Sequence, residues 1–443
     1  MRKLNKKWQM FLYALGGMGV NMLNLMMGSY LCSAIIASGF KADVVANQTF
    51  LSRDLVIPAV WAVFGVVAKI IDGVIDVAMA SFTDNLKTKF GRRRQALLIG
   101  LIPMIAAYVL FTLVTPDPNG ATLLNTVFYG VVLCVFYSFY TLTMVTYYAT
   151  FTEIVETHEQ RNFISNVKSV CDIVYFILGY VVVRMLLNGL NIRPVAMLVL
   201  PIVLTMLIPL FLIRERSTKD GVIEEDGETA ETVNLFKSIA FTFRNRSYIL
   251  WMIVYSFMTF GVQLFLSGIN EYFSVSGMSM IFVMMAAFAP VPLTLILYNK
   301  FTKKRGFGFS FRYVLLIFAV GMLAMFGVSM LPAGLPKTVL SIVTGLISSF
   351  GIGAMFSVAY SVPSELAAEE EKKTGVSNAA MYFAVQGLFA GVASGIGGQA
   401  VLTLLKTHDI VRYMTPICAV ACLLAFILSF LLPKSVSHMG KSE

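Results

Sequence analysis

Residues 55–94 read LVIPAVWAVFGVVAKIIDGVIDVAMASFTDNLKTKFGRRR. The first part of this segment, residues 55–81, is mostly apolar and exceeds the roughly 20 residues that a helix needs to cross a bilayer. A glycine and three arginines, Gly91 to Arg94, close a basic turn directly after it. Basic turns of this kind are typical of the cytoplasmic side of membrane proteins. The segment therefore predicts a membrane-spanning helix and a short cytoplasmic loop.

The rest of the chain repeats this pattern. Of its 443 residues, 58% are hydrophobic and 13% are charged, whereas soluble chains have about 45–50% apolar and about 25% charged residues. This composition excludes a soluble globular enzyme, a disordered chain and a fibrous repeat. Twelve stretches have the length and composition of membrane spans: 9–37, 55–81, 96–115, 121–150, 164–187, 194–213, 248–271, 276–299, 311–332, 337–360, 376–405 and 412–433. We expect an all-α membrane protein with twelve transmembrane helices in two six-helix bundles.

The loops between the predicted spans indicate the orientation of the chain. Cytoplasmic loops of membrane proteins are enriched in lysine and arginine. With the N-terminus in the cytoplasm, the inside segments hold 25 of the 34 Lys and Arg residues and the outside segments hold 6. We therefore expect a multi-pass protein of the cell membrane with both termini in the cytoplasm.

The longest polar segment divides the chain into two halves. Residues 1–213 would form an N-terminal six-helix bundle, 214–247 a cytoplasmic linker, and 248–443 a C-terminal six-helix bundle. Residues 235–248 of this region form either a short interfacial helix or a polar lead into the next span. A second basic turn with a glycine, residues 298–306, follows span eight, as residues 83–94 follow span two. Two parallel halves are typical of transporters with a substrate path at the midplane.

Ionisable groups inside a span are costly and mark candidate functional sites. Asp72 and Asp76 lie one helical turn apart on one face, about 6 Å between Cβ atoms, with Lys69 one turn away in the other direction. Two such close carboxylates in low dielectric need a proton, a bound cation or Lys69 to balance their charge. The alternative is a self-contained Lys–Asp pair with one surplus carboxylate near the cytoplasmic surface.

Span five contains a second pair of charges, Lys168 and Asp172. Lys168 either faces the carboxylates of span two or forms a local salt bridge with Asp172, and the sequence leaves both open. Other intramembrane polar and aromatic side chains can form a sugar site, or can join helices by hydrogen bonds; they include Asn21, Tyr140, Thr141, Tyr148 and Gln386. The chain has no H-E-x-x-H, G-x-S-x-G or P-loop motif. We therefore expect that it is not an enzyme.

The segment from Lys69 to Arg94 resembles the glycoside–pentoside–hexuronide:cation symporter family, whose melibiose-permease-like members belong to the major facilitator superfamily. The matching pattern is a basic residue, then D-x-x-x-D in span two, then an aspartate and G-R-R-R in the loop. In this chain it comprises Lys69, Asp72, Asp76, Asp84 and residues 91–94. Further matches in span one, around span four and directly before span eleven extend the resemblance over essentially the whole chain.

The resemblance implies a secondary active transporter in which Na⁺ or H⁺ drives symport of a sugar or glycoside by alternating access. It implies no cofactor apart from the coupling ion. The implied cation-coupling residues, and metal ligands if the ion is Na⁺, are Asp72 and Asp76, with Thr141 as an additional ligand. The implied substrate-binding residues are Asn21, Lys69, Tyr140, Tyr148, Lys168 and Gln386. The implied cytoplasmic gate comprises Asp84, Gly91, Arg92, Arg93 and Arg94.

Asn21 and Met144 occupy positions where melibiose-permease-like members have carboxylates. An amide hydrogen-bonds a hydroxyl less strongly than a carboxylate does. The Met144 thioether can bind neither the cation nor the sugar. The substrate is therefore expected to differ from melibiose, and both Na⁺ and H⁺ remain open as the coupling ion.

Two other functions compete with this interpretation. A cation-coupled lipid or lysolipid carrier would have an aliphatic cavity wall and an opening toward the bilayer. A non-transporting membrane sensor would need a larger domain outside the membrane than any loop here provides. The expected partners are a small-molecule substrate and the lipid bilayer, with no nucleic acid, and a monomer is the expected state.

Overall fold

The computed structural model describes residues 4, 6–84, 86, 88–154, 158–213, 215, 246–374 and 379–438. These residues are almost entirely helical, and the β-pairing among them is a single bridge between Val56 and Thr122. The chain divides into two compact units, residues 1–37 with 45–231, and residues 38–44 with 232–443. The predicted linker, 214–247, lies outside the described residues except for Glu215, Arg246 and Ser247.

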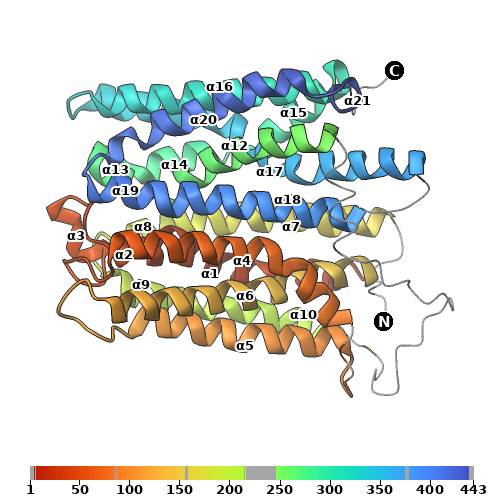
Figure 1. Cartoon of the computed structure of the whole chain (residues 1–443), viewed down its shortest axis with the longest axis horizontal. Helices are drawn as coiled ribbons and strands as arrows, with labels where there is room; N and C mark the ends of the chain where they lie inside the picture. Colours follow the sequence, from red (N-terminus) through yellow and green to blue (C-terminus); the bar gives the residue numbers. More distant parts are fainter. Residues whose placement is uncertain are drawn as a thin grey trace. The chain divides into compact units, whose positions relative to one another are not determined.

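The first unit contains the helices up to residue 212 (Figure 1). Their bounds are α1 Lys7–Leu25, η1 Met26–Leu31, α2 Cys32–Ala34, α3 Ala42–Gln48, α4 Pro58–Asp84, α5 Arg92–Leu113, α6 Leu123–Glu153, α7 His158–Ile177, η2 Leu178–Val182, α8 Val183–Leu186, α9 Ile192–Val199, η3 Leu200–Met206 and α10 Leu207–Leu212. Helix α3 begins in the short segment that belongs to the second unit.

The second unit contains the helices from residue 246 onward. Their bounds are α12 Arg246–Ser267, α13 Ile269–Ser276, α14 Met280–Phe288, α15 Val291–Arg305, α16 Phe307–Ser329, α17 Leu335–Thr374, α18 Ala379–Gly395, η4 Ile396–Val401, α19 Leu402–Thr407, η5 Val411–Tyr413, α20 Met414–Leu428, η6 Ser429–Leu431 and α21 Lys434–Ser437.

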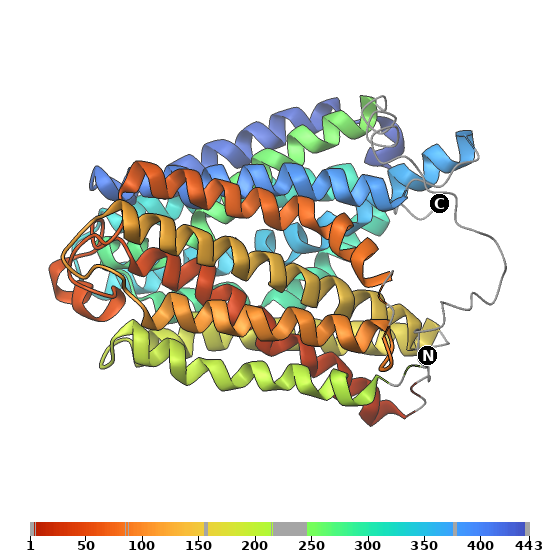
Figure 2. The same cartoon turned by 60° about the horizontal axis from the view of Figure 1, so that its bottom comes forward.

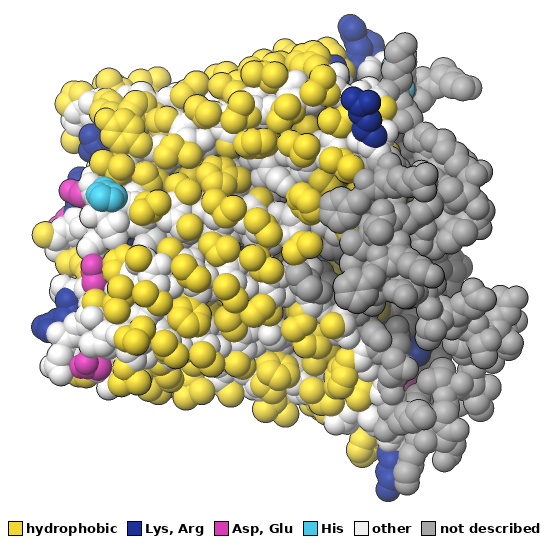
Figure 3. Space-filling view, viewed as in Figure 1, with side chains coloured by type: hydrophobic (Ala, Val, Ile, Leu, Met, Phe, Trp, Pro, Cys, Tyr) yellow, Lys and Arg dark blue, Asp and Glu magenta, His cyan; other side chains and the backbone are white. Residues whose placement is uncertain are grey.

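Ten helices of the described part are long and apolar enough to cross a membrane. They correspond to ten of the twelve predicted spans. The other two predicted spans, 55–81 and 164–187, are also helical, as α4 and as α7 through α8, and these are the helices with charged residues in their interior. Hydrophobic side chains cover the visible sides of the helices, and charged side chains lie toward the helix ends (Figure 3). The predicted all-helical membrane fold is therefore confirmed.

In the first unit, α6 packs along both α4 and α5, and α5 and α6 lie side by side in both ribbon views (Figures 1 and 2). Tyr13 of α1 and Tyr147 of α6 stack with their ring centroids 4.9 Å apart. Each hydroxyl donates to the other residue's carbonyl oxygen, at 2.7 and 2.9 Å. Because both rings are buried, this reciprocal pair satisfies two polar groups inside the bilayer and fixes α1 against α6.

In the second unit, α12 packs against α18, η4 and α20, and α16 packs against α17 and α20. The buried Tyr248 of α12 donates to the carbonyl oxygen of Tyr382 in α18. The C-terminal part of α12, from Phe260 to Ser267, lies against the π-helical turn η4 that follows α18. Such turns interrupt the regular helical ladder and occur frequently at functional sites.

The two predicted basic turns share one backbone conformation. Gly91 has φ 87° and ψ 158° directly before α5, and Gly306 has φ 86° and ψ 165° directly before α16. This region of φ and ψ is essentially restricted to glycine. The same glycine-dependent turn therefore recurs at corresponding places in the two halves, where the sequence predicts two similar basic turns.

Candidate functional site

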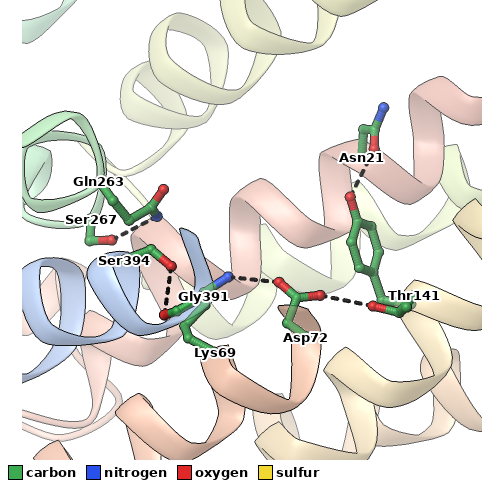
Figure 4. A network of polar contacts seen from close by, with 9 residues as sticks. Asn21, Lys69, Asp72, Thr141, Gln263, Ser267, Gly391 and Ser394 are labelled. Carbon is green, nitrogen blue, oxygen red and sulfur yellow. Dashed lines mark hydrogen bonds and ion pairs between the residues drawn. The ribbon is translucent and has the colours of Figure 1, made fainter. Parts of the chain in front are cut away.

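A carboxylate of α4 is held between an ammonium group and a hydroxyl. The Lys69 Nζ lies 3.4 Å from Asp72 Oδ2, and the Thr141 hydroxyl donates to Asp72 Oδ1 at 2.9 Å (Figure 4). Lys69 and Asp72 meet because residues three apart share a helix face, and Thr141 comes from α6, which packs on α4. The structure thus joins three of the predicted site residues.

An aromatic ring completes the surroundings of Lys69. Its Nζ lies 3.8 Å from the centroid of the Tyr137 ring, which is fully buried. A desolvated cation–π contact contributes about 2 kcal/mol. The side chain of Asp72 is 26% exposed, compared with 11% for Lys69. Asp72 therefore has an internal counter-ion, and an incoming cation or proton would compete with Lys69 for it.

The second predicted carboxylate, Asp76, lies one turn further along α4, but its side chain is outside the described residues. In the part of the chain that the structure describes, no three His, Cys, Asp or Glu side chains converge on a metal-sized site. The described oxygen donors for a cation are consequently the Asp72 carboxylate and the Thr141 hydroxyl. The coupling role of these residues stays a prediction.

A second group of polar side chains joins α1 to α6. The Tyr140 hydroxyl donates to Asn21 Oδ1 at 3.2 Å. The Tyr140 ring stacks on Phe136, with centroids 6.2 Å apart and an interplanar angle of 11°. Asn21 is buried. Two helices, α1 and α6, thus contribute hydrogen-bonding groups to this cluster.

Lys168 pairs with Asp172 in its own helix. The Lys168 Nζ lies 2.6 Å from Asp172 Oδ2, and the side chains are 26% and 31% exposed. The Lys168 Nζ also lies 5.3 Å from the centroid of the Tyr148 ring. Of the two arrangements that the sequence allows, the structure has the local pair. Asp172, absent from the predicted site set, is therefore a half-buried carboxylate among the predicted substrate-binding residues.

One face of α6 supplies residues to both groups. Tyr137, Tyr140, Thr141, Met144 and Tyr148 follow one another at spacings of one to four residues, which places them along one side of a helix. Met144 is buried and offers no strong hydrogen-bonding group. Along α6 it lies between Thr141, which contacts Asp72, and Tyr148, which lies near Lys168. Position 144, where melibiose-permease-like members have a carboxylate and this chain has a methionine, thus lies between the two polar groups.

Four of the predicted gate residues, 91–94, form the N-terminus of α5, and Asp84 ends α4. Glu215 Oε2 accepts hydrogen bonds from the backbone N–H groups of Arg93 and Arg94, at 2.8 and 3.3 Å. A carboxylate in this position satisfies unpaired N–H groups and interacts favourably with the helix dipole. Arg93 is buried, and the side chain of Asp84 lies outside the described residues. Glu215 was not predicted, because it is more than 120 residues away in the sequence.

We expect Gly91→Ala to destabilise the protein by about 1–3 kcal/mol, because residues other than glycine are strained in its conformation and the new Cβ would collide with the Glu215 side chain. A lower melting temperature in detergent would show this. Gly327→Ala is the matched control, since a Cβ at position 327 meets no atom within 4 Å. An unchanged melting temperature for Gly91→Ala would contradict the role of this turn.

The predicted substrate residue Gln386 lies in α18. It is 6% exposed, and its Oε1 accepts a hydrogen bond of 2.9 Å from the Trp251 indole N–H of α12. Trp251 is fully buried, so this bond satisfies an indole donor inside the bundle. The structure therefore places Gln386 at a helix–helix contact within the second unit.

A buried ion pair in the second unit was missed by the sequence analysis. The Lys406 Nζ of α19 lies 2.8 Å from Glu271 Oε1 of α13, and the side chains are 2% and 0% exposed. The Lys406 Nζ also lies 4.8 Å from the centroid of the Phe40 ring. The predicted span ended at residue 405 and left Lys406 in an outside loop, whereas α19 continues to Thr407. A glutamate at the end of span seven was the available signal.

Comparison with known proteins gives the family. The model of the family described as MFS/sugar transport protein matches residues 12–435. The chain belongs to this family. It therefore belongs to the major facilitator superfamily, while its place among the glycoside–pentoside–hexuronide symporters remains a prediction. A search of curated proteins finds no match.

Solved structures of other transporters share the fold. A mutant of the nucleoside transporter NupG has a TM-score of 0.67 at 14% identity, covering 97% of this chain and 100% of that chain. A bacterial homologue of the human lysosomal transporter Spinster, inward-facing and unoccupied, has a TM-score of 0.59 at 12% identity and covers 98% and 97%. A POT family transporter in complex with a thioalcohol-conjugated peptide has 0.61 at 11%, covering 97% and 96%. Because the chain belongs to the MFS/sugar transport protein family, it is a membrane transporter and not an enzyme, and these structures share its fold.

Proposed function

We propose that this member of the MFS/sugar transport protein family is a symporter that couples entry of a sugar or glycoside to Na⁺ or H⁺ by alternating access. The protein would be located in the cell membrane with both termini in the cytoplasm, and it would function as a monomer. The main support is the Asp72 carboxylate, which lies inside a membrane helix, partly exposed, between Lys69 and Thr141. An ionisable group inside a membrane helix is costly, so its presence there indicates a functional role.

Coupling would follow from competition for this carboxylate. Na⁺ bound by Asp72, Asp76 and the Thr141 hydroxyl, or a proton on Asp72, would replace the Lys69 ammonium as the balancing charge. Lys69 would then be released toward the substrate or held by Tyr137 alone. Because moving an uncompensated charge through the bilayer is expensive, the occupied and empty sites would differ in the conformations that they permit.

Substrate recognition would fall to Asn21, Tyr140, Lys168 and Tyr148, with Lys69 as a further contact, whereas Gln386 is already bonded to Trp251. The hydroxyl and amide groups of this set can donate to and accept from sugar hydroxyls. The Tyr148 ring offers an apolar face for a sugar ring. Asp172 would supply the carboxylate that Asn21 and Met144 lack. At the other end of the helices, Asp84 and residues 91–94 would form the cytoplasmic gate.

A ligand-stabilisation screen of the purified protein tests this function. Sugars and glycosides are added one at a time, in Na⁺ or in choline buffer, at several pH values. A ligand at 100 times its Kd stabilises the folded state by about 2.7 kcal/mol, so we expect a higher melting temperature with a cognate sugar. Na⁺ coupling predicts that the shift grows with Na⁺ at fixed pH; H⁺ coupling predicts that it grows as the pH falls, without Na⁺. No stabilisation by any sugar would contradict the proposal.

One feature favours the second candidate, a carrier of lipids or lysolipids. An open groove of about 500 Å³ lies between α12, α18, η4 and α20, and its lining is apolar except for Ser256. An alkyl chain would fit such surroundings, and a sugar would not. If lysolipids raise the melting temperature in the same screen and sugars do not, this candidate replaces the first.

A further inference from the structure

Gln263 of α12 is a half-buried amide with one hydrogen-bonded partner in its own helix. Its Nε2 donates to Ser267 Oγ at 3.2 Å (Figure 4). A glutamine side chain offers two donors and two acceptor sites. Among the residues that the structure describes, Gln263 Oε1 accepts no hydrogen bond, and it is not enclosed as a buried atom. The amide therefore keeps a free acceptor that reaches accessible space.

Gln263 lies in the C-terminal part of the apolar helix α12, and a free amide there is unfavourable against lipid, because unsatisfied polar groups in hydrocarbon cost several kcal/mol. Gln263 is therefore expected to face a hydrated path. Gln386 provides the contrast, since it is 6% exposed and already bonded to Trp251. Of these two glutamines of the second unit, Gln263 is the one that a solute can reach.

The neighbouring π-helical turn holds this amide in place. A Cβ at Gly398 of η4 would lie 2.6 Å from Ser267 Oγ and 3.1 Å from Gln263 Cγ. The backbone of η4 thus lies directly against both side chains, which limits their rotamers. A side chain that is held before binding loses less conformational entropy when a ligand arrives.

We propose that Gln263, oriented by Ser267 and Gly398, is a substrate-binding residue in the second unit that contacts uncharged hydroxyl groups of the sugar or glycoside. This inference rests on the proposed function. The adjacent donor and acceptor of an amide match two neighbouring hydroxyls. The described groups here are neutral, so this residue selects for hydroxyl geometry, while any charge selection belongs to Lys168 and Asp172.

Cysteine accessibility tests the exposed position without knowledge of the substrate. The five natural cysteines, all free thiols, are replaced by alanine, and Gln263→Cys and Gln386→Cys are made separately in this background. Both are treated in membranes with a charged, membrane-impermeant methanethiosulfonate. We expect the thiol at position 263 to react at least tenfold faster than the one at position 386. Equal rates, or faster reaction at 386, would overturn the inference.

Substrate protection and affinity test the binding role. The sugar that most stabilises the wild-type protein should slow labelling at position 263, and Gln263→Leu should weaken its binding roughly tenfold, as loss of one hydrogen bond implies. Gly327→Ala should bind it as the wild type does. Suppose that a sugar binds the wild type, does not slow labelling at position 263, and binds Gln263→Leu equally well. The inference is then wrong, while the proposed function stands. If the wild-type protein binds no sugar, the proposed function fails first, and this inference falls with it.

Discussion

The Asp72→Asn variant will reach the membrane at normal levels and lose gradient-driven uptake. Asparagine has the shape of aspartate but no charge, so it can neither balance Lys69 nor attract a cation. It can still accept the hydrogen bond from the Thr141 hydroxyl, which in the wild type measures 2.9 Å. The fold should therefore survive while the driving force is lost. Uptake of the cognate sugar into energised vesicles measures the coupling to the gradient, and equilibrium exchange of the same sugar measures whether the folded carrier still moves it.

The matched control is Asp43→Asn, which removes a carboxylate from the exposed side of α3 and should leave uptake unchanged. Thr141→Val removes a single hydrogen bond to Asp72 and should weaken coupling less, by roughly tenfold in ion affinity. Asp76→Asn should resemble Asp72→Asn if the two carboxylates share one ion. Accumulation that is undiminished in Asp72→Asn would refute coupling at this carboxylate.

Contacts within one helix were accessible from the sequence, and contacts between helices mostly were not. The Lys69–Asp72 and Lys168–Asp172 pairs follow from spacings of three and four residues. The position of Thr141 beside Asp72 came only from family resemblance, because α4 and α6 meet through tertiary packing. The ring of Tyr137 beneath Lys69 was not predicted, since one apolar run contains many aromatic residues and spacing does not say which one meets a cation.

The fold itself was more accessible than the site, for a physical reason. A bilayer forces each span to satisfy its own backbone hydrogen bonds, so apolar length alone predicts a helix. It does not specify rotation about the helix axis. Gln386 illustrates this, because its position in span eleven was predictable while its contact with Trp251 depends on how α18 faces α12. The turns at Gly91 and Gly306 were predictable because each combines a glycine with several basic residues after an apolar span.

Replacing Lys406 by methionine will produce the largest loss of stability in the second unit. The variant would leave Glu271 as an unpaired charge in a site where its side chain is 0% exposed. Breaking a buried ion pair from one side costs about 3–5 kcal/mol, whereas replacing both partners by apolar groups is often neutral or stabilising. We therefore expect Lys406→Met to lower the melting temperature by on the order of 10 °C, and Glu271→Leu with Lys406→Met to restore most of it.

The comparison with the double variant separates charge from packing. Lys300→Met, which removes an exposed lysine of α15, should leave the melting temperature within about 1 °C of the wild type, as is usual for surface substitutions. If the double variant is as unstable as Lys406→Met, the loss comes from the contact with Phe40 and from the lysine stem, not from the abandoned charge. If it recovers stability but not uptake, the ion pair is retained for transport, because stability alone would then not require two opposite charges at this depth in the helices.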